Sequence, residues 1–263
     1  MSPDTAALLR DHRADYGYDG DYRVIPAPGV AGITAAMCVG LALTSARLAK
    51  RHRLAALVVG ATAACLMITA AMFVRTTRIG KFEVWAQILS GLGLRGDETV
   101  LDLGCGRGAV LLAVAKLLPN GRAIGVDIWR ADQTHNAEAN TRDNAESEGV
   151  ADRIELHTAD MTNLPLPDDS VDLIVSSLAV HNIPGRHGRA QAISEAARVL
   201  RPGGRLVLAD LAETAVHVRQ LHELGWTSAR RRNLGWRMWW GPGMSTHLVT
   251  ATKPAVSRTA SIG

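Results

Sequence analysis

The chain has 263 residues, of which 47% are hydrophobic and 21% are charged, and its formal net charge at pH 7 is +4. Disordered chains combine few apolar residues with a high net charge, so this composition excludes disorder and supplies apolar side chains for a large core. The three cysteines, Cys38, Cys65 and Cys105, are too widely spaced for a disulfide framework or a CxxC zinc site.

A polar segment, residues 1–23, precedes two uncharged segments. It carries five aspartates and three arginines, so it does not resemble the positively charged start of a secretory signal. Residues 24–46 and 54–74 contain no Asp, Glu, Lys or Arg. A membrane-spanning helix needs about 20 apolar residues, so the sequence predicts two transmembrane helices within residues 24–75, the first shortened by two early prolines. A buried hairpin in a soluble protein is the alternative.

The positive charges beside the two apolar segments predict the orientation of this hairpin. The joint between the segments carries four of them, Arg47, Lys50, Arg51 and Arg53. The outer flanks carry six, namely Arg10, Arg13, Arg23, Arg75, Arg78 and Lys81. Because positive residues concentrate on the cytoplasmic side of a membrane, we expect a multi-pass membrane protein whose termini and whose following domain face the cytoplasm.

From about residue 82, short β-rich runs alternate with helical ones, which is typical of a parallel sheet covered by helices. Strands are predicted over 98–103, 122–128, 153–158, 171–176, 205–210, 228–234 and 246–253. Helices are predicted over 81–92, 109–118, 137–148, 189–200 and 213–224. The last two strands can pair as an antiparallel edge. The fold class is therefore α/β: a doubly wound, Rossmann-like, mostly parallel seven-stranded sheet over residues 76–254, preceded by a two-helix transmembrane hairpin and followed by a loose tail, 255–263.

The first predicted strand runs directly into a glycine-rich turn, Gly104-Cys105-Gly106-Arg107-Gly108. Ligands of open α/β sheets bind at the carboxyl ends of strands, and glycine permits both positive φ angles and the close approach of a ligand to the backbone. The GxGxG spacing differs from the dinucleotide fingerprint GxGxxG, and the carboxylate of Asp102 beside the turn would repel a diphosphate. Asp127, at the end of the second strand, is placed to accept hydrogen bonds from ribose hydroxyls. A nucleoside without phosphates fits both acids.

Four segments in this order resemble the motifs of the class I S-adenosylmethionine-dependent methyltransferases, in particular their small-molecule branch. They are VLDLGCGRG (100–108), GVDI (125–128), TADMTNLPLPDDSVDLIVSSLAVHNI (158–183) and RVLRPGGRLVLAD (198–210). The resemblance covers the chain from about Lys81 to Pro254. It implies that the cofactor is S-adenosyl-L-methionine.

Carried over residue by residue, the resemblance also implies a set of cofactor contacts. It places Gly104, Cys105, Gly106 and Gly108 in the loop at the methionine side, Asp102 near the amino end, Asp127 on the ribose, Ile128 against the adenine, Asp160 near the adenine amino group with Met161 beside it, and Ser176 beneath the sulfonium. Two of these residues have simpler alternatives. Asp160 could be only a turn residue, and Asp127 could only cap the following helix.

After Asp127 the chain departs from the family pattern, which usually continues with a short Ser-rich turn. Here it reads DIWRADQTHNAEAN. We expect Trp129 to contact the cofactor, and the polar side chains of Asp132, Gln133, His135 and Asn136 to line the acceptor or adenine side. The alternative is a surface loop with an exposed tryptophan over the adenine edge.

His181 is the only catalytic candidate. It follows the fourth predicted strand, five residues after Ser176, where it would face the cofactor. Methyl transfer from a sulfonium chiefly requires alignment of the reactants, but an acceptor that must lose a proton needs a base, a role that suits imidazole near neutral pH. The alternative is that His181 and Asn182 brace the loop before Pro184. No HxxxH or paired-carboxylate spacing occurs, so no metal is predicted.

The run Arg230-Arg231-Arg232 precedes Trp236, Trp239 and Trp240, and cations with aromatic rings also occur in nucleic-acid-binding proteins. With an apolar hairpin on the same chain, these tryptophans fit a lipid interface better, or they roof the active site. We therefore do not expect a nucleic-acid partner.

The sequence predicts a membrane-anchored methyltransferase that moves the methyl group of S-adenosylmethionine to an O, N or S atom of a small or lipid-like acceptor. Two other classes of protein are alternatives: a nonenzymatic membrane-bound cofactor-binding or scaffolding module, and a nicotinamide-dependent oxidoreductase. The GxGxG spacing disfavours the second. The acceptor, its accepting atom and the oligomeric state stay open at this point.

Overall fold

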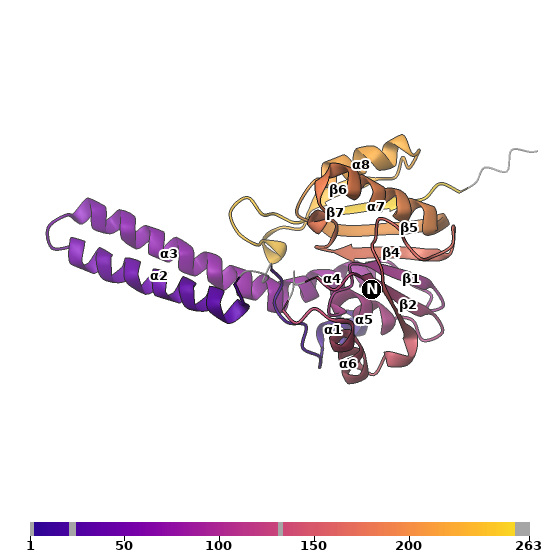
Figure 1. The fold of residues 1–263 in the computed structure, drawn as a ribbon, viewed down its shortest axis with the longest axis horizontal. Helices are drawn as coiled ribbons and strands as arrows, with labels where there is room; N and C mark the ends of the chain where they lie inside the picture. The colour runs from indigo at the N-terminus through magenta and orange to yellow at the C-terminus, as the bar shows by residue number, and fades with distance from the viewer. Residues whose placement is uncertain (1–2, 21–24, 131–133, 256–263) are drawn as a thin grey trace, which may run out of the picture.

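The computed structural model describes residues 3–20, 25–130 and 134–255, and these residues form two parts (Figure 1). A hairpin of two long helices projects from an α/β domain. The described chain on both sides of the hairpin packs against that domain.

Seven strands form one sheet in the described part of the chain. They are β1 (Thr99–Leu103), β2 (Arg122–Asp127), β3 (Ile154–Thr158), β4 (Val171–Ser177), β5 (Leu200–Asp210), β6 (Arg230–Asn233) and β7 (His247–Thr252), in the spatial order β3-β2-β1-β4-β5-β7-β6. Strands β1 to β5 pair in parallel, and β7 is antiparallel to both β5 and β6. The predicted doubly wound sheet with an antiparallel edge is confirmed. Its strand order reverses between β1 and β4, and open α/β sheets bind ligands beside such a reversal.

Helices cover both faces of the sheet. They are α4 (Lys81–Gly91), α5 (Ala109–Ala115), α6 (Glu138–Glu148), α7 (Gly185–Val199) and α8 (Thr214–Glu223), with short helical turns η2 (Ala151–Arg153) and η3 (Val180–Asn182). Successive side chains of a strand point to opposite faces. In β4, Leu173 and Val175 therefore join the core under α4 and α5, whereas Ile174 joins the core under α7 and α8.

Strand β5 begins at Leu200, earlier than the predicted start at residue 205, and includes the predicted turn at 202–204. Its pairing with β4 shifts in register between Val171, which faces Leu200, and Leu173, which faces Arg205. Gly203 has a φ of +79°, a value that favours glycine. The extra residues thus bulge out of the ladder while the strand remains paired on both sides.

The hairpin consists of α2 (Ala27–Leu48) and α3 (Arg53–Arg75), which pack against each other along their length (Figure 1). Small residues allow the close approach. The Ser45 hydroxyl donates a hydrogen bond to the Ala56 carbonyl oxygen at 2.8 Å, and a Cβ on Gly60 would lie 3.0 Å from Ser45 Oγ. By length and composition, both helices are apolar and long enough to cross a membrane.

Helix α3 continues into the domain without a break. A π-helical turn, η1 (Thr76–Gly80), joins it to α4, so that one helix runs from Arg53 to Gly91 over 39 residues. The hairpin half of this helix exposes apolar side chains, and its domain half buries Trp85 and Leu89 in the core. The hairpin and the domain therefore share one rigid element.

The described residues before the hairpin belong to the domain core, which their polar composition did not predict. Helix α1 (Pro3–Arg10) places Leu9 in the core, and Tyr16 joins the same cluster. Asp19 then accepts a hydrogen bond from Lys81 Nζ at 2.8 Å. The chain thus enters the hairpin from a point next to the start of α4.

The loop between β6 and β7, residues 234–246, docks on the π-helical turn. It contains the short helix η4 (Trp236–Met238). Thr76 Oγ1 donates a hydrogen bond to the carbonyl oxygen of Trp239 at 2.8 Å. A Cβ on Gly80 would lie 2.0 Å from the carbonyl oxygen of Arg237, so this contact requires glycine.

We expect Gly80→Ala to push the β6–β7 loop away from the helix and to lower the free energy of unfolding by about 1 to 3 kcal/mol, the range for overpacking. Gly91→Ala is the matched control at the end of the same helix, because a Cβ at Gly91 meets nothing within 4 Å. Alanine there should leave stability unchanged or raise it by up to about 1 kcal/mol. Denaturant unfolding of both variants in detergent micelles measures the difference, and equal stabilities would contradict the packing argument.

Candidate cofactor and acceptor site

A cavity of about 320 Å³ lies at the carboxyl ends of the central strands, beside the reversal of strand order between β1 and β4. Its lining includes the two groups of residues that follow, and His181 and helix α4 also contribute to it. The strand-end lining consists of Asp102, Gly104, Cys105, Gly106, Asp127, Ile128, Asp160 and Met161. The hairpin-side lining consists of Phe73 from α3 and Trp240 and Met244 from the β6–β7 loop. One cavity therefore connects the predicted cofactor residues with the base of the hairpin.

At Gly104 the glycine turn packs too closely against its neighbours to accept a side chain. Gly104 has a φ of +70°, and a Cβ there would lie 2.2 Å from the Cβ of Ala179. Gly108 has a φ of +87° and precedes α5 as its left-handed N-cap. Gly106 donates its backbone N–H to Asp127 Oδ2 at 2.8 Å. The turn thus joins the ends of β1 and β2 into one backbone cradle.

Asp102 and Asp127 are both buried at strand ends. Burial raises the pKa of Asp102 to about 8, and the negative charge of Asp127 adds to this effect. Burial also raises the pKa of Asp127, whereas hydrogen bonds from the backbone N–H groups of Gly106 and Trp129 act in the opposite direction and lower it. Asp102 Oδ1 has no hydrogen-bond partner among the described residues. A buried carboxyl group beside a cavity that lacks a partner is suited to a positively charged ligand group.

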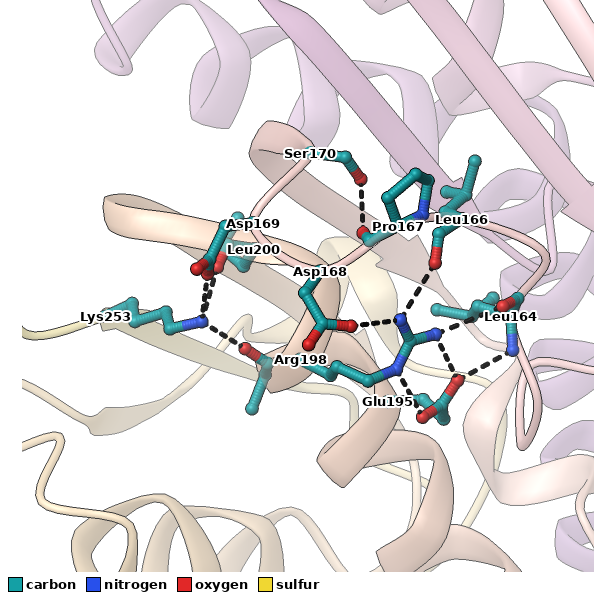
Figure 2. A network of polar contacts seen from close by, with 11 residues as sticks. Leu164, Leu166, Pro167, Asp168, Asp169, Ser170, Glu195, Arg198, Leu200 and Lys253 are labelled. Carbon is teal, nitrogen blue, oxygen red and sulfur yellow. Dashed lines mark hydrogen bonds and ion pairs between the residues drawn. The ribbon is translucent and has the colours of Figure 1, made fainter.

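A polar network fixes the loop that carries Asp160 and Met161 (Figure 2). Arg198 on α7 donates hydrogen bonds to the carbonyl oxygens of Leu164 at 3.1 Å and Leu166 at 2.8 Å. Further contacts join Asp168, Asp169, Glu195, Leu200 and Lys253 to the same network. The start of the loop is thereby held at the cavity, which Asp160 and Met161 both line, as the sequence predicts.

Three predicted cofactor residues, Gly108, Ser176 and Trp129, are absent from the described lining of the cavity, and the two side chains among them point elsewhere. Ser176 is fully buried and donates its hydroxyl to the Leu103 carbonyl oxygen at 2.7 Å, whereas its neighbour Ser177 lines the cavity. Trp129 packs against the core, and its Nε1 donates to Thr158 Oγ1 at 2.7 Å. The expectation for these two side chains is corrected. Strand alternation turns Ser176 away, and the hydrogen bond to β3 holds the indole outside.

The other expectations for the segment after Asp127 have mixed outcomes. Ile128 lines the cavity. His135 and Asn136 are absent from the described lining, and Asn136 Nδ2 instead donates to the carbonyl oxygen of Arg130 at 2.7 Å. Asp132 and Gln133 lie outside the described residues.

His181 lines the cavity and has a carboxylate partner. Its Nδ1 lies 2.6 Å from Oδ1 of Asp210, and its backbone N–H donates to Oδ2 of the same residue at 3.1 Å. Asp210 is fully buried at the end of β5. A carboxylate accepts the Nδ1–H, so the acceptor lone pair of the neutral imidazole lies on Nε2. Asp210 was missed, although it ends a strand next to β4, and the carboxyl ends of parallel strands meet at one edge.

Helix α4 forms a further wall of the cavity, which sequence reasoning also missed. Lys81, Phe82 and Trp85 line it. Lys81 is 4% exposed and pairs with Asp19, which is also in the lining. Trp85 Nε1 donates to Ser177 Oγ at 2.9 Å. An apolar wall thus contains one satisfied ion pair.

The family model described as a methyltransferase domain matches residues 101–208. Methyltransferase GfsG from Streptomyces halstedii is 37% identical over 125 residues, which cover 48% of this chain and 42% of that protein. The 27-O-demethylrifamycin SV methyltransferase of Amycolatopsis mediterranei is 38% identical over 121 residues, which cover 45% of this chain and 40% of that protein. The chain thus spans less than half the length of these two curated relatives.

A solved structure of a SAM dependent methyltransferase from Aquifex aeolicus superposes with a TM-score of 0.51 at 20% identity, covering 65% of this chain and 88% of that one. At this identity the superposition shows the fold. The matched residues include Gly104, Cys105, Gly106, Asp127, Asp160 and His181, all of which line the cavity. The resemblance stated from the motifs is confirmed: the chain contains a domain of the class I S-adenosylmethionine-dependent methyltransferase family.

Proposed function

We propose that the protein is a membrane-anchored enzyme that transfers the methyl group of S-adenosylmethionine to a small or lipid-like acceptor. The observation that supports it is the single cavity, which combines a cofactor cradle, a paired histidine and an apolar lining that begins on the hairpin.

The residues at the strand ends fit the cofactor. Gly104 packs closely against Ala179, so that a Cβ there would displace a residue of the cavity lining. Asp102 offers an unpartnered carboxyl oxygen to an amino group, and Asp127 lies where ribose hydroxyls would bind. Ile128 and Asp160 would contact the adenine. When bound, S-adenosylmethionine supplies an activated methyl group on a sulfonium.

His181 provides acid–base chemistry next to this cradle. Asp210 accepts the Nδ1 proton and so directs the lone pair of Nε2 away from itself. An acceptor hydroxyl can transfer its proton to Nε2 while its oxygen takes the methyl group. The products are then the methylated acceptor, S-adenosylhomocysteine and a protonated His181, whose charge the buried Asp210 carboxylate stabilises. This arrangement favours an oxygen acceptor over a thiolate or a neutral amine, which need no base.

The hairpin is suited to a bilayer. Helix α2 has 22 residues, which at 1.5 Å per residue gives about 33 Å, close to the thickness of the hydrocarbon core. Its outward side chains include the exposed Val30, Ile33, Met37, Val39 and Leu43, and those of α3 include Leu54, Leu57, Val58, Met67 and Ile68. An exposed apolar surface of this extent is typical of a membrane contact. Both ends of the hairpin return to the domain, so the domain and both ends would lie on one side.

We expect cofactor binding to release a proton. Burial raises the pKa of Asp102 to about 8, so we expect the protonated carboxyl to predominate at pH 7 before a ligand binds. A cationic amino group beside Asp102 favours the carboxylate and lowers this pKa. Because binding then releases a proton, the affinity for S-adenosylhomocysteine should increase as the pH rises from roughly 6 towards the pKa of about 8. Calorimetric titration at pH 7 in phosphate and in Tris should give different enthalpies, and Asp102→Asn should remove the difference. Equal enthalpies for the unaltered protein would contradict the assignment.

His181→Ala should lower turnover by about a hundredfold or more, with little change in S-adenosylhomocysteine affinity. In the unaltered protein the rate should decline as the pH is lowered, because protonated imidazole cannot accept a proton, and Asp210→Asn should also reduce turnover. His187→Ala, at an exposed position of α7, is the control. Activity would be followed with labelled methyl donor on a panel of phenols, alcohols, thiols, amines and lipids. A small, pH-independent loss in His181→Ala would show that the residue only braces its loop.

The hairpin orientation can be tested with single cysteines at positions 50 and 152, in a chain whose Cys38 and Cys65 are replaced by serine. Position 50 lies at the tip, and position 152 lies on the domain, where the Asp152 side chain is 79% exposed. A membrane-impermeant maleimide should reach position 152 from the cytoplasmic face only and position 50 from the opposite face only. Labelling of both positions from the cytoplasmic face would mean that the hairpin lies on the membrane surface.

A further inference from the structure

The hairpin-side lining forms a boundary between the cavity and the proposed bilayer. Phe73 lies near the end of α3, and its ring meets the ring of Trp240 at a centroid distance of 5.8 Å and an angle of 72°. Met244 completes this part of the lining and is 45% exposed. Phe73 and Met244 are at least partly exposed at the base of the hairpin, whereas Trp240 is 6% exposed and lies in the lining against Phe73.

The β6–β7 loop is held at the depth of the hairpin base, as Figure 1 shows. Besides the hydrogen bond from Thr76, the guanidinium of Arg75 stacks over the Trp236 ring at 4.2 Å from its centroid. Trp236 is 60% exposed. Tryptophan and arginine at the end of an apolar helix are typical of the headgroup region of a membrane. The loop would therefore lie in this region, with the exposed Met244 next to the acyl chains.

The polarity of the lining changes between its two parts. The strand-end lining carries Asp102, Asp127 and Asp160, and His181 is paired with Asp210, whereas the hairpin-side lining carries no charged side chain. The volume of about 320 Å³ is near the lower limit for small-molecule sites. A cavity of this size cannot enclose a long apolar chain in addition to the cofactor.

We propose that the acceptor is a membrane amphiphile with a hydroxyl-bearing head and an apolar chain, whose head reaches His181 while its chain leaves the cavity past Phe73, Trp240 and Met244 into the bilayer. This inference rests on the proposed function, since it uses both the membrane position of the hairpin and the base at His181. It adds the substrate class and the path of the chain. Each methylene that remains in lipid avoids the loss of about 0.8 kcal/mol that exposure to water would bring, so such an acceptor need not leave the membrane to react.

The test uses the full chain in vesicles of phosphatidylcholine and phosphatidylglycerol. The probe is a long-chain 4-alkylphenol with a diazirine on the ring, and the comparison probe is the same phenol without the chain, added in water. Met244→Trp narrows the proposed exit. Met67→Trp is the matched control, because Met67 is also exposed but lies on the hairpin away from the cavity. After irradiation, peptide mass spectrometry locates the label, and calorimetry measures S-adenosylhomocysteine affinity for each variant.

In the unaltered protein and in Met67→Trp, the long-chain probe should label residues 178–184, which line the cavity around His181. Met244→Trp should reduce this labelling about tenfold or more by steric exclusion of the chain, without changing cofactor affinity or labelling by the chain-free phenol. Equal effects on both probes, undiminished labelling in Met244→Trp, or label confined to the outer faces of α2 and α3 would overturn the proposal. Failure of the unaltered protein to bind S-adenosylhomocysteine would instead refute methyl transfer, and the labelling pattern would still decide where the chain lies.

Discussion

The continuity of the helix from Arg53 to Gly91 determines how the two parts of the molecule are related. Helices that end at a membrane surface are often followed by a flexible linker, which lets the attached domain rotate. Here the helix that ends the hairpin goes on to form a wall of the cavity, with Phe73 in one half and Trp85 in the other. The N-terminal side is fixed as well, because Asp19 pairs with Lys81 at the start of α4. The cavity therefore has a defined position relative to the hairpin axis.

The site places two carboxyl groups where water cannot solvate them well. Asp102 and Asp127 lie at neighbouring strand ends, and each raises the free energy of ionising the other. The fold tolerates this repulsion because Asp127 receives backbone N–H groups from Gly106 and Trp129. For Asp102, one backbone hydrogen bond, at Leu111, opposes the rise in pKa, and its Oδ1 has no hydrogen-bond partner among the described residues. The strand ends therefore favour a ligand with a positive charge.

Much of the fold could be predicted from local pattern. Period-two alternation and glycine turns located the strands to within a few residues. The order of strand, glycine turn, helix and second strand up to Asp127 was predicted correctly, because each of these elements leaves a local signal in the sequence. The prediction that Ser176 faces the cofactor was wrong because two adjacent serines at a strand end point to opposite faces. Sequence alone does not show which of the two faces holds the cavity. Asp210 and Phe73 were missed because they meet the site only through tertiary packing, whereas Trp240, which lines the cavity, is one of the tryptophans expected from the sequence to fit a lipid interface or to roof the active site. The polar segment before the hairpin reads as solvent-exposed, although Tyr16 and Leu9 are buried.

The π-helical turn at 76–80 has a consequence for the angular position of the hairpin around its own axis. Each residue of an α-helix advances the side-chain direction by about 100°, so one residue more or less in this turn would rotate every side chain of α3 by that angle relative to α4. Phe73 would then leave Trp240, while the apolar character of the hairpin and the core of the domain would hardly change. The number of residues in this short segment therefore fixes the rotation of α3 relative to α4. That rotation determines which side chains of the hairpin face the cavity.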